Sequence, residues 1–112
     1  MNDKDRELYR IIDIVIECCT TRLGNENVSV TKEDIFGKCK RENANITRCM
    51  IAYHLCVFGL THATIAMLLD RTEQSIRNLI EEHYDLNKTN RAYNIANSQV
   101  ERMINESNSK AI

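Results

Sequence analysis

Hydrophobic residues recur along the chain mainly every three or four positions, the spacing that places them on one face of an α-helix. The pattern predicts a helix over residues 3–23 that ends at Gly24, and a later helix that ends at Gly59. The later helix is apolar around most of its circumference, so we expect it to lie at the centre of the core. Asn45 or Thr47 is expected to cap its start.

The first predicted helix has an apolar face wider than one stripe, because Ile14, Ile16 and Cys18 add to the main pattern. Such a face is either covered on two sides within the domain or shared with a second subunit. The sequence therefore raises the hypothesis of a homodimer that forms through the N-terminal helix.

The rest of the chain divides into helices and polar connections. We expect helices over residues 32–39, 61–69, 73–84 and 89–106, a loop over 38–45 and a frayed tail over 107–112. The last helix is expected to turn one apolar face to the core, formed by Ala92, Ala96, Val100, Met103 and Ile104.

Composition supports a helical fold. The 112 residues include no proline and only three glycines, whereas the tight turns of β-sheets draw on both. The length suits a single domain. We therefore predict an all-α fold of about six helices around one core. Its parts are an N-terminal helical extension (1–35), a central unit (36–85) and a C-terminal helix (89–106).

Cysteine usage and the N-terminus bear on the compartment. The N-terminus is charged, unlike a signal peptide, and no stretch approaches the ~20 apolar residues of a membrane-spanning helix. The five cysteines contain no CxxC pair, which is typical of small, buried, reduced side chains. They are Cys18, Cys19, Cys39, Cys49 and Cys56. We expect a cytoplasmic protein with no membrane partner.

The segment most informative about function is residues 60–79, LTHATIAMLLDRTEQSIRNL. In a helix-turn-helix, two short helices are joined by a turn of three or four residues, and they need a small residue where they approach most closely. Ala66 supplies the small residue. The apolar residues with the spacing of a shared core are Ile65, Leu69, Ile76 and Leu79. The sequence predicts a helix-turn-helix at about residues 61–84.

The expected turn of this motif is Asp70-Arg71-Thr72. Many such turns contain glycine, and aspartate adopts the left-handed backbone conformation more readily than most residues. Asp70 is therefore expected to replace the glycine. The Thr72 hydroxyl is expected to accept a hydrogen bond from the first amides of the second helix.

The second helix of the motif carries side chains of the kinds that read DNA. Glutamine and asparagine pair with adenine, arginine prefers guanine, and serine and threonine contact bases or phosphates. We expect Gln74, Ser75 and Asn78 to contact bases, with Thr72 and Arg77 beside them. The alternative is that these residues form only a solvated helix face.

Residues 65–76, IAMLLDRTEQSI, resemble without a gap the motif I-G-x-x-F-G-R-D-H-T-T-V. This motif belongs to the C-terminal DNA-binding domain of the bacterial replication initiator DnaA, whose architecture also occurs in the Trp-repressor-like superfamily. The resemblance covers about residues 36–82 and implies a helix-turn-helix in which Arg71 and the residues at the two threonine positions, Gln74 and Ser75, contact DNA.

The match is incomplete, because Thr72 replaces the aspartate and Glu73 the histidine of the motif. We therefore do not expect recognition of a DnaA box. Nothing in the chain resembles the ATPase module of the initiator.

Basic residues upstream resemble the basic loop of the same family. They are Lys38, Lys40 and Arg41, followed by Arg48 at the position of the arginine that leads its long helix. Together with Arg71 they are expected to hold phosphates, which contributes affinity but little sequence information.

The overall charge argues in part for a different function. The net charge is −1 and the pI is about 6.3, whereas nucleic-acid binders commonly have basic surfaces. Glu81, Glu82 and Asp85 would repel phosphates and confine any DNA contact to the first half of the second helix. The alternative function is a protein-interaction module that keeps the helix-turn-helix fold without binding DNA.

Motifs for catalysis or metal binding are absent from the sequence. His54, His62 and His83 lack metal-ligand spacing, and there is no glycine-rich phosphate loop or nucleophile elbow. We expect neither an enzyme nor a protein that needs a metal or cofactor. The sequence favours a regulator, associated with transcription or replication, that binds double-stranded DNA.

Overall fold

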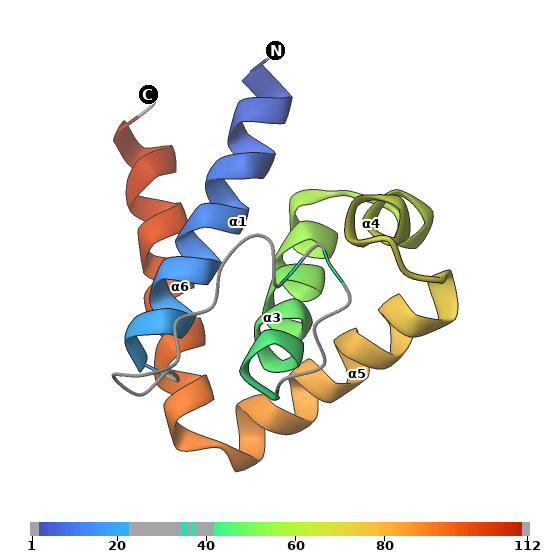
Figure 1. Cartoon of the computed structure of the whole chain (residues 1–112). Coiled ribbons are helices and arrows are strands. Elements are labelled where there is room, and N and C mark those ends of the chain that lie inside the picture. The colour runs from blue at the N-terminus through green and yellow to red at the C-terminus, as the bar shows by residue number, and fades with distance from the viewer. Residues whose placement is uncertain (1–2, 23–34, 36, 38–41, 111–112) are drawn as a thin grey trace.

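The computed structural model describes residues 3–22, 35, 37 and 42–110, and none of these residues lies in a β-strand (Figure 1). The described helices are α1 (Asp3–Arg22), α3 (Glu42–Phe58), α4 (His62–Leu69), α5 (Glu73–Thr89) and α6 (Arg91–Lys110). The all-α prediction is therefore confirmed. Most of the helix predicted at 32–39 lies outside the described residues, although Ile35 is helical.

The helices surround α3. Figure 1 shows α1 and α6 running in opposite directions side by side, with α3 between this pair and the α4–α5 pair. Helix α3 packs against α1, α4 and α5, while α6 packs against α1 and α5. The buried α3 side chains include Cys49, Met50, Ile51 and Leu55, so the prediction of a central core helix is confirmed.

The wide apolar face of α1 is covered within the domain. Its two neighbours, α3 and α6, both pack along it. The side chains buried there are Leu8, Ile11, Ile12, Ile14, Val15, Cys18 and Cys19. The width of this face thus has an explanation that requires no second subunit.

Helix boundaries differ from the predicted ones at three places. Helix α3 begins at Glu42, so the predicted caps at Asn45 and Thr47 are wrong, and both residues lie inside the helix. Thr47 is fully buried, which shows that the core extends into the first turns of α3. Helix α5 continues past residue 84 because Leu86 packs partly against the core. Helix α6 continues to Lys110 instead of fraying after residue 106.

A single residue, Asn90, separates α5 from α6. Its backbone N–H donates to the carbonyl of Leu86, which ends α5, and its side-chain Oδ1 accepts from the N–H of Tyr93, which caps α6. The side chain of Asn94 donates across this corner to the carbonyl oxygen and Oδ1 of Asn87, at 3.1 and 3.2 Å. The predicted start of the last helix near residue 90 is confirmed.

The core face of α6 matches the predicted face except at its start. Ala92, expected in the core, is exposed, whereas Tyr93 is fully buried. Ala96 and Val100 are buried as expected, and Asn97 joins them. Tyr93 and Asn97 can be buried because both find polar partners in the interior.

Those partners form a buried cluster of aromatic and polar side chains. The Tyr53 and His83 rings stack with their centroids 3.9 Å apart, and His83 Nδ1 lies 2.6 Å from the Tyr93 hydroxyl. His54 Nε2 lies 2.7 Å from Asn97 Oδ1. Burial lowers the pKa of His83 from 6.5 to about 4, with a smaller contribution from His54, and burial also lowers the pKa of His54. Both histidines are therefore neutral in the folded protein at pH 7.

The described cysteines agree largely with the prediction of buried, reduced thiols. Cys18, Cys19 and Cys49 are buried and reduced, Cys56 is reduced and half-buried, and Cys39 lies outside the described residues. Burial raises the pKa of Cys19 to about 12 and raises that of Cys49 as well. These two thiols remain protonated at neutral pH, which makes them unreactive.

The buried histidines predict that acid destabilises the protein. Because the folded pKa of His83 lies near 4 and its ordinary value is 6.5, the unfolded chain binds more protons between these pH values. The contribution of neutral His83 is complete above pH 6.5 and is lost as the pH falls towards 4. We expect a loss of roughly 2–3 kcal/mol from this residue, measured as the free energy of urea unfolding.

His83→Gln is expected to flatten this pH dependence, although it also lowers stability at pH 7. His62→Gln is the matched control, because His62 lies at the start of α4 and only partly in the interior. An unchanged slope in His83→Gln between pH 6.5 and 4 would contradict the assignment.

Candidate nucleic-acid interface

Helices α4 and α5 pack against each other through the residues predicted for a shared core. Ile65, Leu69 and Ile76 are fully buried, and Ala66 and Leu79 are nearly so. Ala66 is also the residue whose carbonyl accepts a hydrogen bond from Arg71 N–H after the helix ends. The inward face of this segment was therefore predicted correctly from its sequence.

The connection between α4 and α5 has the predicted turn chemistry. Asp70 adopts the left-handed conformation, with φ 53° and ψ 53°, and so takes the role expected of a glycine. Thr61 and Thr72 cap α4 and α5 by accepting hydrogen bonds from the N–H groups of Thr64 and Ser75, at 3.2 and 3.1 Å. The first turn of α5 is thus fixed at a defined point after a tight turn.

The first two turns of α5 present polar side chains to solvent. Thr72, Gln74 and Asn78 are exposed, whereas Ser75 is half-buried. Gln74 Nε2 donates to Asn78 Oδ1 at 3.1 Å, so two of the three predicted base-reading side chains lie together on one helix face. Arg77 is exposed and lies 3.7 Å from Glu73, an ion pair that solvent weakens.

Arg71 has mainly a structural environment. Its guanidinium donates to the carbonyls of Leu69 and Asp70, both at 3.0 Å, and to the carbonyl of Gly37 at 2.9 Å. The side chain therefore folds back over the α4–α5 turn and joins it to a residue 34 positions earlier in the chain. This geometry makes Arg71 a positioning residue for the start of α5.

Arg48, predicted to hold phosphates, lies in the interior instead. It is only 3% exposed, and its guanidinium donates to the carbonyls of Ile35 and Gly37 at 3.0 and 3.3 Å. Arg48 lies on the side of α3 that faces the core. Its charge-assisted hydrogen bonds there offset the free-energy cost of burying the guanidinium. The prediction of a phosphate contact at Arg48 is wrong.

Gly37 accepts hydrogen bonds from both arginines, Arg48 on α3 and Arg71 at the α4–α5 turn. It immediately precedes the predicted basic segment in the chain. The other predicted phosphate contacts, Lys38, Lys40 and Arg41, lie outside the described residues.

The second half of α5 is acidic where it faces solvent. Glu81, Glu82 and Asp85 are exposed, and the basic residues nearest to them along the helix are Arg77 and Lys88. They line a shallow depression together with Asn78, Tyr84 and Lys88. The surface of α5 therefore changes from polar at its start to negative towards its end.

Two features are absent from the part of the chain that the structure describes. None of its helices has both the length and the apolar character needed to cross a bilayer. No group of three or more histidine, cysteine, aspartate or glutamate side chains within it is arranged to hold a metal ion.

Comparison of the chain with protein-family models, curated proteins and solved structures gives no significant match. The resemblance to the DNA-binding domain of DnaA thus remains a prediction from residues 65–76.

Sequence reasoning missed a pocket between α1, α3 and α6, which Tyr53, His54 and Glu101 line on one side. Tyr53 and His54 on α3 lie more than 40 positions before Glu101 on α6, so no local motif marks the three together. The pocket could not be predicted because the sequence does not reveal that α3 and α6 lie beside each other.

The geometry of Arg71 predicts a loss of stability on its replacement. Arg71→Gln removes three guanidinium hydrogen bonds to backbone carbonyls and should lower the free energy of unfolding by about 1–2 kcal/mol, measured by urea denaturation. Arg77→Gln is the matched control, because its exposed ion pair should contribute less than about 0.5 kcal/mol. Equal stability of the two variants would contradict the structural role of Arg71.

Proposed function

We propose that the chain binds double-stranded DNA through a helix-turn-helix formed by α4 and α5, as a regulator associated with transcription or replication. The observation that carries this proposal is the start of α5, where a capped first turn presents Gln74 and Asn78 on one exposed face. Amide side chains at this place on a recognition helix are suited to adenine in the major groove.

Each part of the α4–α5 segment has a role in this proposal. Gln74 and Asn78 contact base edges, and Thr72, Ser75 and Arg77 contact the sugar-phosphate backbone or neighbouring bases. Because Ser75 is half-buried, its contribution is confined to the rim of the interface. Two amides that are already hydrogen-bonded to each other need less ordering when they meet a base.

Phosphate contacts are assigned to the basic segment Lys38, Lys40 and Arg41 rather than to Arg48 or Arg71. Gly37, which adjoins the segment in the chain, is hydrogen-bonded to Arg71 at the turn that leads into α5. Gly37, the residue before this segment, is therefore held beside the turn that leads into the proposed reading face. The two arginines then act indirectly, by fixing Gly37.

Acidic residues limit how α5 can approach DNA. Glu81, Glu82 and Asp85 occupy exposed positions in the second half of the helix. A helix that lay along the groove over its full length would bring these carboxylates near phosphates. The proposed binding mode therefore inserts α5 by its N-terminal end.

The rival function, a protein-interaction module, is favoured by one specific observation. Met67 on α4 is 82% exposed, and large exposed apolar side chains are common at protein interfaces. Under this alternative, α4 and the acidic half of α5 contact a protein and the amides of α5 are only solvated.

Fluorescence anisotropy with random-sequence duplex DNA tests the proposal. We expect a Kd of about 1–100 μM at moderate salt, weakening steeply as salt increases. Lys40→Ala and Arg41→Ala should each reduce the slope of log Kd against log salt by about one. Arg71→Ala is unsuitable for this purpose, because it also disturbs the turn.

Base reading is tested separately, on sequences selected from a random pool. Gln74→Ala should reduce the preference for selected over random sequence by about 1–3 kcal/mol, whereas Gln99→Ala, an amide on α6, should leave it unchanged. Absence of binding at low salt with the helical content intact would overturn the proposal and favour the protein-interaction module.

A further inference from the structure

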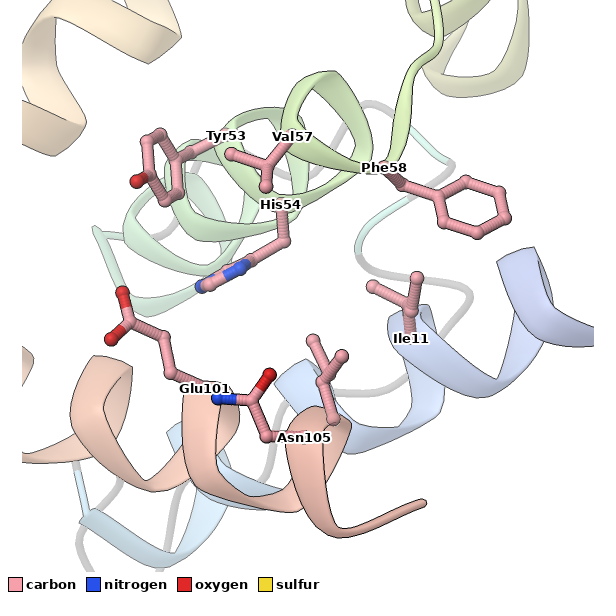
Figure 2. A pocket seen from close by; sticks show the side chains of 8 residues that line it. Ile11, Tyr53, His54, Val57, Phe58, Glu101 and Asn105 are labelled. Atoms are coloured by element: carbon pink, nitrogen blue, oxygen red, sulfur yellow. The ribbon is translucent and has the colours of Figure 1, made fainter. Parts of the chain in front are cut away.

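A pocket of about 420 Å³ opens between α1, α3 and α6, on a different set of helices from the α4–α5 pair (Figure 2). This volume falls within the range of about 300–1,000 Å³ found for small-molecule sites. Its apolar lining consists of Ile11, Val57, Phe58 and Ile104. Val57 is 67% exposed, so the pocket leaves apolar surface in water that a ligand would cover.

The polar lining residues of the pocket are Tyr53, His54, Glu101 and Asn105. Figure 2 shows Tyr53, His54 and Glu101 on one side and Phe58 and Ile11 on the other, with Asn105 between the two sides. The pocket therefore has a polar end and an apolar end, the arrangement expected of a site for an amphiphilic small molecule.

The charge at the polar end is negative. Glu101 is the charged residue among the lining side chains, none of which is lysine or arginine. His54 is neutral at pH 7, because burial lowers its pKa. The carboxylate of Glu101 accepts a hydrogen bond from Asn97 Nδ2 at 3.4 Å, and Asn97 Oδ1 in turn meets His54 Nε2 at 2.7 Å. This chain of contacts holds the acid at the edge of the pocket.

We propose that this pocket binds a small organic cation, with its ammonium group at Glu101 and its apolar body against Val57, Phe58 and Ile104. An ammonium there forms a charge-assisted hydrogen bond with the carboxylate of Glu101. An anionic ligand of the same shape would meet the carboxylate at the polar end and is excluded. Binding does not depend on the proposed DNA-binding function and is measurable without DNA.

Three probes of similar shape and different charge test the proposal: 2-phenylethylamine, 2-phenylethanol and 3-phenylpropionate. Binding is followed by chemical-shift changes in the ¹⁵N-labelled full chain. We expect saturable shifts at residues 53–58 and 101–105, with the amine binding about five- to tenfold more tightly than the alcohol. The carboxylate should give no saturable shift in this region.

Glu101→Gln should abolish the preference for the amine over the alcohol while retaining weak binding of both. Glu106→Gln is the matched control, because Glu106 is an exposed glutamate on the same helix that does not line the pocket. Val57→Thr replaces an exposed side chain by one of similar size. It should weaken the binding of the amine and of the alcohol by a similar factor of about three.

Four outcomes would overturn the proposal. The first is the absence of saturable shifts for the amine in the native chain. The second is equal affinity for all three probes. The third is an amine preference that survives Glu101→Gln. Shifts in the same residues that depend on protein concentration, without a probe, would show that a second copy of the chain covers the pocket, and would likewise contradict ligand binding there.

Discussion

Burial of α3 on several sides is the constraint on which the rest of the structure depends. Helix α3 is covered by α1, α4 and α5, so every polar side chain that it carries into the interior needs a hydrogen-bond partner there. No buried side-chain nitrogen or oxygen in the described residues lacks such a partner. Arg48 meets the carbonyls of residues 35 and 37, and His54 meets Asn97. The buried polar residues of α3 thereby connect it to residues 35 and 37 and to α6.

The same constraint separates structural from functional positive charge. Arg48 lies in a helix that is covered on several sides, and its guanidinium donates to backbone carbonyls. It is therefore not accessible to a ligand. Arg71, which closes the α4–α5 turn, is used in the same way, whereas Arg77 remains exposed. The proposed DNA contacts are therefore concentrated at the start of α5 and in the basic segment after Gly37.

Local features of the fold could be predicted from the sequence, because their causes are local. The threonine cap at residue 72 and the left-handed conformation of Asp70 depend on side-chain chemistry within a few residues, and both were predicted. The inward face of α4 and α5 followed from spacing alone. The expected reading face was also predicted as a set of exposed residues, except that Ser75 is half-buried.

Features that depend on distant partners could not be predicted in this way. Tyr93 is buried instead of Ala92 because His83, ten residues earlier, provides a partner for its hydroxyl. Arg48 is buried because of backbone carbonyls at residues 35 and 37. The polar end of the pocket requires α3 and α6 to come together through His54 and Asn97. Hydrophobic periodicity identifies the buried face of each helix, but it does not identify the helix against which that face packs.

The one-residue junction at Asn90 has a mechanical consequence. A connection of several residues would work as a hinge, but here only the φ and ψ angles of one residue lie outside the two helices, and Asn94 braces the corner against Asn87. The angle between α5 and α6 is therefore set by the two backbone dihedrals of Asn90, by the contacts between Asn94 and Asn87, and by the packing of the two helices on each other.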